Sequence, residues 1–272
     1  MRLPLALLLP ALMAFPLRAQ AGAGDLLVSP ARVTLDNRNR TTELILSNRG
    51  DATDTYRIRL IRMEMTADGG LREATAPVTG VDPAELVRYA PHQITLEPGQ
   101  TQVLRVMLRK PADLPDGEYR VHMLFQAIPP ELAGTAAPSK DKGKGVSIKL
   151  VPIMGLAIPV TVQQGEITAK AGLADLHLDT EKGQAFAAFH LTRSGNASVY
   201  GNLEATFQPK GGKAVPVGQM NGVAVYPPLD ARNVKLALEP PKGVALKSGT
   251  LILTFKTADE PLPEAEIRLD IP

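Results

Sequence analysis

Cysteine and tryptophan are absent from the 272-residue sequence, and aromatic residues make up only 4% of it. The absence of cysteine excludes disulfide bonds, thiolate metal sites and catalysis by a thiol nucleophile. With so few aromatic residues, Val, Ile, Leu and Met have to fill the interior. Hydrophobic residues account for 44% of the chain and charged residues for 21%, which is typical of a globular protein with a packed core.

The N-terminus has the three parts of a secretory signal peptide. Arg2 precedes an apolar run from Leu3 to Leu17, and the small residues Ala19 and Ala21 then flank Gln20. The run is shorter than the about 20 residues that a membrane-spanning helix needs, and no later segment comes close. We therefore expect cleavage after Ala21, export of the mature chain and no stable membrane insertion; an uncleaved anchor is the less favoured alternative.

Cleavage at this point leaves a mature chain of balanced charge. The full sequence has 30 Lys and Arg against 28 Asp and Glu, and the segment removed contains Arg2 and Arg18 but no acidic residue, so 28 of each sign remain. Nucleic-acid binding requires a basic field. No nucleic-acid partner is therefore expected.

The mature sequence has the short alternating segments of an all-β protein. In residues 118–126, apolar side chains predicted to share one face alternate with polar ones: Tyr119, Val121, Met123 and Phe125 against Glu118, Arg120 and His122. Leu104, Val106 and Leu108 alternate with Arg105 and Arg109 in the same way. This period of two predicts sheets with one face on a core and one face in water, arranged as sandwiches or barrels.

One break divides the chain into two β-rich parts. Residues 129–145 begin with Pro129-Pro130 and are rich in Ala, Gly, Pro, Ser and Lys, which predicts a long mobile loop. The following segment, 146–162, is interrupted by proline and glycine, so we expect a bent edge strand. Turns are predicted at 181–183, 210–212 and 240–243. The simplest architecture is two sandwiches, covering residues 22–161 and 162–272.

The sequence contains no recognisable catalytic or metal-binding constellation. Its four histidines have no metal-ligand spacing; His177 and His190 could face one another across a hairpin, but no third ligand accompanies them. No nucleophile elbow, phosphate loop or zinc-protease motif is present. We expect a protein that is not an enzyme and that uses no cofactor and no metal.

Two basic residues stand out by their positions. Arg32 lies in the first strand expected in the mature chain, and Lys149 lies just before the second domain. Cations near the two ends of one domain's sequence can converge where two sandwiches meet. The alternative is that both are ordinary exposed charges.

The order of short motifs along the mature chain resembles the PapD-like periplasmic chaperones of the chaperone–usher pathway. The segments that carry the resemblance are Ser29-Pro30-Ala31-Arg32-Val33, Leu44-Ile45-Leu46-Ser47-Asn48, the stretch from Leu96 to Val106 containing Pro98-Gly99, the strand ending in Ile128-Pro129-Pro130, Ser147-Ile148-Lys149-Leu150, and Gly195-Asn196-Ala197-Ser198-Val199-Tyr200. The resemblance implies two immunoglobulin-like β-sandwiches at an angle, with a cleft between them.

The resemblance also implies a function and a site. Arg32 and Lys149 would hold the C-terminal carboxylate of a pilus or pilus-like subunit in the periplasm, since a carboxylate suits a planar guanidinium and a second cation. The last strand of the first domain would then complete the subunit's sandwich by donor-strand complementation. An outer-membrane usher is a further candidate partner.

Two departures from the family pattern concern the client more than the fold. Counting back from Lys149, the positions of the bulky apolar donors fall on Lys140, Lys142 and Lys144, whose ammonium groups cannot fill an apolar groove. Either the donors come from another register, with Val146, Ile148 and Leu150 as candidates, or the client is not a standard subunit. The family's interdomain arginine is replaced by Ile153.

A second function class stays open at this point. A structural or adhesive surface protein could also be built from two immunoglobulin-like domains. Such a protein has no reason to place Arg32 and Lys149 in one cleft. The positions of these two residues therefore distinguish a chaperone from a structural or adhesive protein.

Overall fold

The computed structural model describes residues 25–75, 80–128, 154–257 and 265–272. The predicted signal peptide and the predicted loop 129–145 lie outside these ranges. Lys149, Ile153 and the donor-strand candidates Val146, Ile148 and Leu150 lie outside them as well.

The first domain is a sandwich of two sheets. One sheet has the order β1 (Leu26–Ser29), β3 (Thr41–Asn48), β9 (Thr101–Leu108) and β7 (Val87–Ala90). The other has the order β2 (Val33–Leu35), β11 (Gly155–Gln164), β10 (Gly117–Ile128), β4 (Asp54–Ile61) and β8 (Gln93–Leu96). The chain changes sheet between β1 and β2, so the residues around Arg32 reach the edge of the second sheet.

The second domain is also a sandwich. Its sheets are β12 (Ala169–Glu181), β13 (Gln184–Gly195) and β16 (Ala231–Leu238), and β15 (Val215–Val225), β14 (Val199–Pro209), β17 (Gly249–Thr257) and β18 (Ala265–Ile271), each in that order. The three predicted turns lie between consecutive strands, and the third joins β16 to β17 of the other sheet. At the first turn, Lys182 and Gly183 have positive φ, as a two-residue hairpin turn requires. The prediction of two β-sandwiches is confirmed.

Each sandwich has its own apolar core. In the first, Val121, Met123 and Phe125 of β10 are at most 1% exposed and pack among side chains from both sheets. Phe207, Leu253 and Phe255 have the same role in the second. The predicted inward face of residues 118–126 is thus confirmed, as is the alternation of Leu104, Val106 and Leu108, which are all buried.

The predicted outward face of the same strand is only partly correct. His122 is 4% exposed, not in water as the alternation suggested, and Arg120 is also largely enclosed. The reason is tertiary, because residues of the second domain lie against this end of the sheet. Period-two patterning cannot reveal such a second layer of protein.

The junction of the two domains also differs from the expectation. β11 stays in the sheet of the first domain as far as Gln164, where it pairs with Gly117, and β12 starts at Ala169. The expected boundary between residues 161 and 162 therefore falls inside β11, and the change of domain takes place between Gln164 and Ala169.

β11 is an edge strand over most of its described length. The short strand β2 pairs with it in parallel only at Val160–Val162. Gly155 to Pro159 pair with β10 on one side and, among the described residues, with no strand on the other. The expectation of an edge strand is confirmed for this part of the segment.

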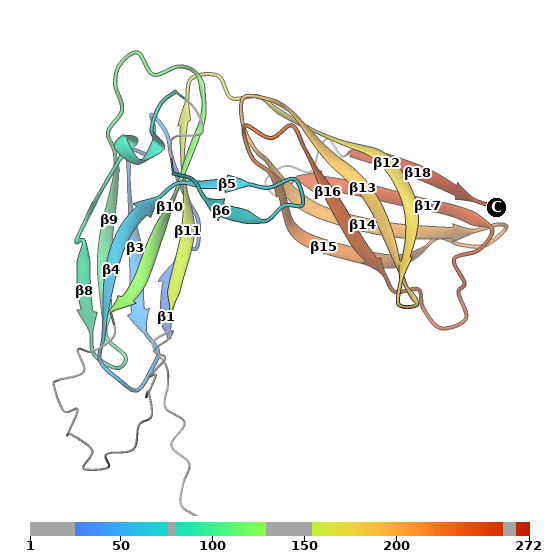
Figure 1. The fold of residues 1–272 in the computed structure, drawn as a ribbon, viewed down its shortest axis with the longest axis horizontal. Helices are drawn as coiled ribbons and strands as arrows, with labels where there is room; N and C mark the ends of the chain where they lie inside the picture. The colour runs from blue at the N-terminus through green and yellow to red at the C-terminus, as the bar shows by residue number, and fades with distance from the viewer. Residues whose placement is uncertain (1–24, 76–79, 129–153, 258–264) are drawn as a thin grey trace, which may run out of the picture.

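A hairpin of the first domain reaches across to the second. It consists of β5 (Met63–Met65) and β6 (Leu71–Glu73), and it bridges the space between the two sandwiches (Figure 1). Met65 packs in a small buried cluster with Ala224 and Tyr226, and the Ala67 carbonyl accepts a hydrogen bond of 2.7 Å from the Asn233 amide. These contacts brace the angle between the domains.

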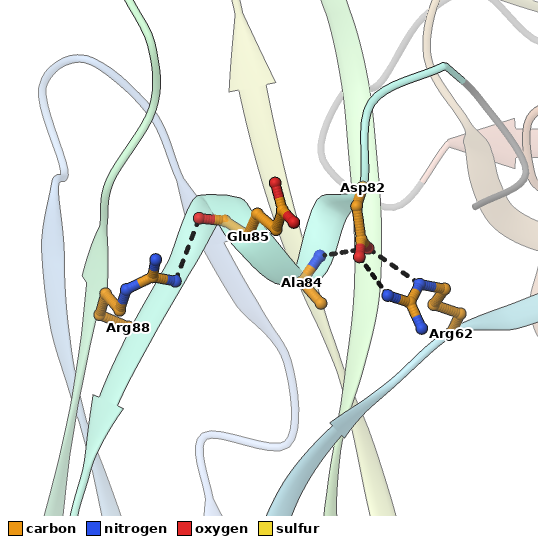
Figure 2. A network of polar contacts seen from close by, with 5 residues as sticks. All are labelled: Arg62, Asp82, Ala84, Glu85 and Arg88. Atoms are coloured by element: carbon orange, nitrogen blue, oxygen red, sulfur yellow. Dashed lines mark hydrogen bonds and ion pairs between the residues drawn. The ribbon is translucent and has the colours of Figure 1, made fainter. Parts of the chain in front are cut away.

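The base of this hairpin is tied to a 3₁₀ turn, η1 (Pro83–Leu86). The Asp82 carboxylate caps the turn by accepting from the Ala84 amide at 3.0 Å, and it also forms a bidentate ion pair with Arg62 (Figure 2). The hydrogen bonds from Arg62 hold the pKa of Asp82 below its usual range. No helix in the described ranges has the length and apolar content to cross a membrane.

Candidate functional site at the corner between the domains

Arg32 lies at the corner where the two sandwiches meet. Its guanidinium carbon is 4.0 Å from the centre of the Tyr200 ring of the second domain, within the range of a cation–π contact. The side chain is exposed, and no carboxylate in the described part of the chain forms an ion pair with it. Arg32 therefore presents a positive charge that is held in place but not neutralised.

Arg120 makes a second, deeper contact of the same kind. Its guanidinium carbon is 3.2 Å from the centre of the Tyr226 ring, and its Nη1 atom is buried with no hydrogen-bond partner among the described residues. Burial lowers the pKa of Arg120 to about 10, which still leaves the group charged at neutral pH. The site thus contains a buried cation with an unused donor.

His122 is the third basic group of the corner. It is buried, and its Nδ1 atom also lacks a hydrogen-bond partner in the described ranges. Burial lowers the pKa of His122 to about 4, and the positive charges of Arg120 and Arg32 act in the same direction. His122 is therefore neutral at pH 7.

Strand register explains why these three residues meet. Arg120 and His122 are two positions apart on β10, so both point to the outer face of the sheet. On β11, Pro159 pairs with His122 and Thr161 pairs with Arg120. Thr161 in turn pairs with Thr34 of β2, two residues after Arg32. The register brings Arg32 level with His122 on the same outer face. We call Arg32, Arg120 and His122, with Tyr200 and Tyr226, the corner site.

The nearest carboxylate at the corner is already engaged. Glu118 accepts a hydrogen bond from the Ser198 amide at 3.1 Å and another from the Ser198 hydroxyl. The Asn196 carbonyl accepts from the Glu118 amide at 3.1 Å. The turn of residues 195–200, one of the segments that carried the family resemblance, is thereby fixed against the first domain. The hydrogen bonds of Glu118 join the two domains, and Glu118 forms no ion pair with an arginine in the described part of the chain.

A buried arginine elsewhere shows what a purely structural role looks like. Arg193 donates to the carbonyls of Leu229, Gly195 and Ala197 and forms an ion pair of 2.9 Å with Asp230. Its hydrogen-bonding capacity is largely used within the second domain. Arg120 differs because its buried Nη1 atom has no partner and because Arg120 lines a pocket between the domains with Arg62, Met63 and Pro227.

The sequence identified one of the three basic residues of the corner. Arg32 was a candidate, whereas Arg120 and His122 were assigned to a solvated face. One signal in the sequence could have indicated these two residues. They are basic, they lie on the same face of one strand, and the only acidic residue on that face is Glu118. Whether Lys149 belongs to the same corner lies outside the described residues.

His177 and His190 do not face one another across the hairpin. His190 forms a hydrogen bond of 2.9 Å with Asp175, and it pairs with Ala174 across the sheet and not with His177. Within the described ranges there is no group of three or more side chains arranged to hold a metal ion.

The molecule is thus a two-domain, immunoglobulin-like β-sandwich protein with a cationic corner. No protein-family model matches the chain, and no curated protein sequence matches it. It is similar to the solved structure of the YadV chaperone, with 13% identity and a TM-score of 0.48 over 91% of this chain and 100% of that one.

Two further solved structures are similar to the same extent. One is from a chaperone–tip adhesin complex of CFA/I fimbriae biogenesis, with 12% identity and a TM-score of 0.47 over 90% of this chain and 98% of that one. The other is from the CsuC–CsuE chaperone–tip adhesion subunit complex of Acinetobacter baumannii, with 14% identity and a TM-score of 0.47 over 89% and 97%. Because these similarities are low, the fold assigned to the present chain rests on the order of the strands in its own sheets.

Proposed function

We propose that this chain is an exported periplasmic chaperone that binds pilus or pilus-like subunits and has no catalytic activity. The observation that carries the proposal is the corner site, in which an exposed, unpaired Arg32 lies beside Arg120 and next to the open edge of β11. Of the similar solved structures, one is named as a chaperone and two as chaperone complexes with a tip adhesin or tip adhesion subunit of fimbriae or pili. The proposal assigns a role of this kind to the present chain.

The chemistry of the corner suits a chain terminus. A C-terminal carboxylate has two acceptor oxygens, and Arg32 presents a planar set of donors to which it can bind in a bidentate manner. Tyr200 orients the guanidinium from the second domain, so less side-chain freedom is lost on binding. Lys149 is proposed as the second cation, as the family resemblance implies. Arg120, which is more deeply buried than Arg32, adds to the positive potential of the corner site.

The bound subunit would extend from the corner along the edge of β11. On the side away from β10, the backbone of Gly155 to Ile158 has no strand partner among the described residues and can add a strand of the client to the sheet. We propose that residues on the N-terminal side, with Val146, Ile148 and Leu150 as candidates, supply the apolar side chains for donor-strand complementation. The client would be shielded at its exposed edge without any covalent step.

The proposal is tested with the tagged mature protein and its Arg32→Ala and Lys149→Ala variants. Each is incubated with a periplasmic extract, and the captured proteins are identified by mass spectrometry. Loss of one charge-assisted anchor should weaken client binding by roughly 2–5 kcal/mol, so the wild type should retain pilus-type subunits and the variants should not. Equal recovery of the same subunits by all three proteins would contradict the anchoring role.

A structural or adhesive surface protein is the competing assignment. It predicts that the mature protein is found outside the periplasm on fractionation and that Arg32→Ala changes neither its location nor its partners. The unpaired state of Arg32 favours the chaperone, because an arginine kept for structure alone is expected to be saturated with partners, as Arg193 is.

A further inference from the structure

The outer face of the sheet that contains β11 carries arginine well beyond the corner. On β4, Tyr56 and Ile58 point into the core and are both 2% exposed, while Arg57 and Arg59 alternate with them and are exposed. Arg57 and Arg59 therefore lie on the same outer face as Arg120 and Arg32. We call this surface, defined by these four residues, the arginine face.

The neighbours of Arg57 and Arg59 are neutral. Arg59 pairs across the strands with Leu124, and Arg57 pairs with Gln126 on one side and Gln93 on the other. Arg59 donates a hydrogen bond of 3.2 Å to the Gln126 side chain. Because none of these neighbours is acidic, the charges of the two arginines are not cancelled by the sheet that carries them.

The five strands of this sheet contain only two carboxylates, and both are engaged. Asp54 of β4 accepts a hydrogen bond of 3.2 Å from the Tyr56 hydroxyl. Glu118 of β10 is bound to Ser198 of the second domain. The described residues of β2, β8 and β11 include no Asp or Glu. The arginine face therefore contains four arginines, and Glu118 is the one carboxylate at the outward positions of the five described strands.

The arginine face has a defined spacing. Arg57 and Arg59 are two residues apart on one strand, which places them about 7 Å apart along it. Along β10, His122 is followed by Leu124 and Gln126, which pair with Arg59 and Arg57 of β4. The two arginines therefore lie farther from the second domain than His122 does. A client strand added at the edge of β11 would be separated from this row by β11 and β10. The row would therefore face another part of the bound subunit.

We propose that the arginine face docks an acidic protein surface, and that Arg57 and Arg59 select clients with carboxylates spaced by two residues on an exposed strand. This inference rests on the proposed function, since the acidic surface would belong to the bound subunit. Charge complementarity at such a surface accelerates encounter and discriminates between partners more than it adds affinity. The corner site would hold the chain end, and the arginine face would choose which chain is held.

The test uses synthetic strand peptides and the full mature protein. One peptide has alternating Thr and Val, Glu at two positions two residues apart, and a free C-terminal carboxylate. A second replaces both Glu by Gln, and a third is the acidic peptide with an amidated C-terminus. Binding is measured by fluorescence anisotropy as a function of salt concentration.

The expected result separates the two claims. Arg57→Ala with Arg59→Ala should weaken binding of the acidic peptide about tenfold and reduce its salt dependence, and binding of the Gln peptide should be unchanged. Lysine at both positions should restore most of the affinity. Arg105→Ala on the opposite sheet is the matched control, because it removes one exposed arginine from the same domain, and it should change nothing.

Several outcomes would overturn the inference. They are equal affinity for the acidic and Gln peptides, an equal loss in the Arg105→Ala control, or no measurable binding of the acidic peptide. Tighter binding of duplex DNA or of phosphatidylglycerol vesicles that depends on Arg57 and Arg59 would assign the face to another anion. If amidation has no effect while Glu-to-Gln replacement does, the carboxylate anchor fails and the arginine face stands.

Discussion

The two outer faces of the first sandwich differ although both sheets pack on one core. On the face of β1, β3, β9 and β7, Ile45 pairs with Val103 and both are about half exposed, and Arg105 forms an ion pair of 2.9 Å with Glu43 on the neighbouring strand. On the opposite sheet, Arg57 and Arg59 have neutral neighbours. The first face thus has one arginine paired with a carboxylate, beside Arg88 of β7, which donates to backbone carbonyls. On the other face, neither Arg57 nor Arg59 forms an ion pair within the described ranges.

The difference agrees with the proposed binding surface. An exposed ion pair across two strands contributes little to stability. Arginines without acidic partners repel one another and so destabilise the fold. Their presence on one surface is therefore not explained by a role in stability. Tyr200 and Tyr226 of the second domain contact Arg32 and Arg120 on the arginine-bearing side of the first domain. The domain arrangement and the charge distribution therefore mark the same surface.

The largest effect in this comparison is expected from substitution of a core-facing residue of the arginine-bearing sheet. Phe125 is 1% exposed in the core of the first sandwich, so Phe125→Ala should lower the free energy of unfolding by about 3–5 kcal/mol. Urea denaturation followed by circular dichroism measures the loss. Arg59→Ala on the outer face of the same sheet is the control, and a similar loss there would contradict the assignment of the two faces.

The next effect is a loss of stability on acidification that depends on His122. Its pKa is about 4 in the folded chain against 6.5 for an ordinary histidine, so between these values the unfolded chain binds more protons. Stability should fall as the pH drops from about 6.5 to about 4, by up to about 3 kcal/mol, and this contribution should not change further below pH 4.

Denaturation midpoints measured across this pH range test the assignment to His122. The His122→Gln variant cannot be protonated and should show a flatter pH profile. The exposed His190 serves as the control through His190→Gln, which should keep the wild-type profile. An unchanged slope in His122→Gln would assign the acid sensitivity to another group.

A smaller effect is expected at the base of the interdomain hairpin. Asp82→Ala removes the cap of η1 and the partner of Arg62, and loss of the cap alone should cost about 1 kcal/mol. Because the pKa of Asp82 is lowered in the folded chain, its contribution is present above the ordinary carboxylate pKa and is lost as the pH falls through the folded value. The midpoint difference between wild type and variant should therefore shrink at low pH.

Glu85→Ala is the matched control for this change. Glu85 is exposed and takes part in the network through its carbonyl, which accepts from Arg88 (Figure 2). Its side-chain removal should leave the midpoint nearly unchanged. A cost equal to that of Asp82→Ala would mean that acidic charge near η1 matters more than the cap.

The smallest effect is expected on the outer face of the sheet formed by β1, β3, β9 and β7. Arg105→Ala breaks an ion pair whose two side chains are 61% and 52% exposed, so the change in unfolding free energy should stay below about 0.5 kcal/mol. Urea midpoints for Arg105→Ala and Glu43→Ala should agree with the wild type within that range. A clearly larger loss would show that this face is more than a solvated surface.

Much of the fold followed from patterns visible in the sequence. Alternation in residues 118–126 and 104–109 predicted inward side chains that are buried, and residues 181–183 were predicted to form a turn, which the structure shows as a hairpin between β12 and β13. Such local signals succeed because the side chains of a strand alternate between two faces whatever the strand pairs with. The β5–β6 hairpin was not predicted, since its short strands bury little except Met65, and Met65 packs only against the other domain.

The candidate site was predicted only at Arg32. Arg120 and His122 appeared as solvated residues because the sequence gives the face of a strand but not what covers that face. The tyrosines that stack on the two arginines lie 168 and 106 positions further along the chain, at Tyr200 and Tyr226. No local pattern connects residues so far apart.

By itself, the sequence determined that this protein is all-β, that it consists of two sandwiches and that thiol chemistry is excluded, because composition and period-two alternation are local properties. Only the tertiary structure decided which charges meet. The parallel pairing of β2 with β11 sets Arg32 level with His122, and the packing of the second domain buries one arginine and leaves the other exposed. Electrostatic interactions depend on distance in space and on burial, and neither can be read from distance along the chain.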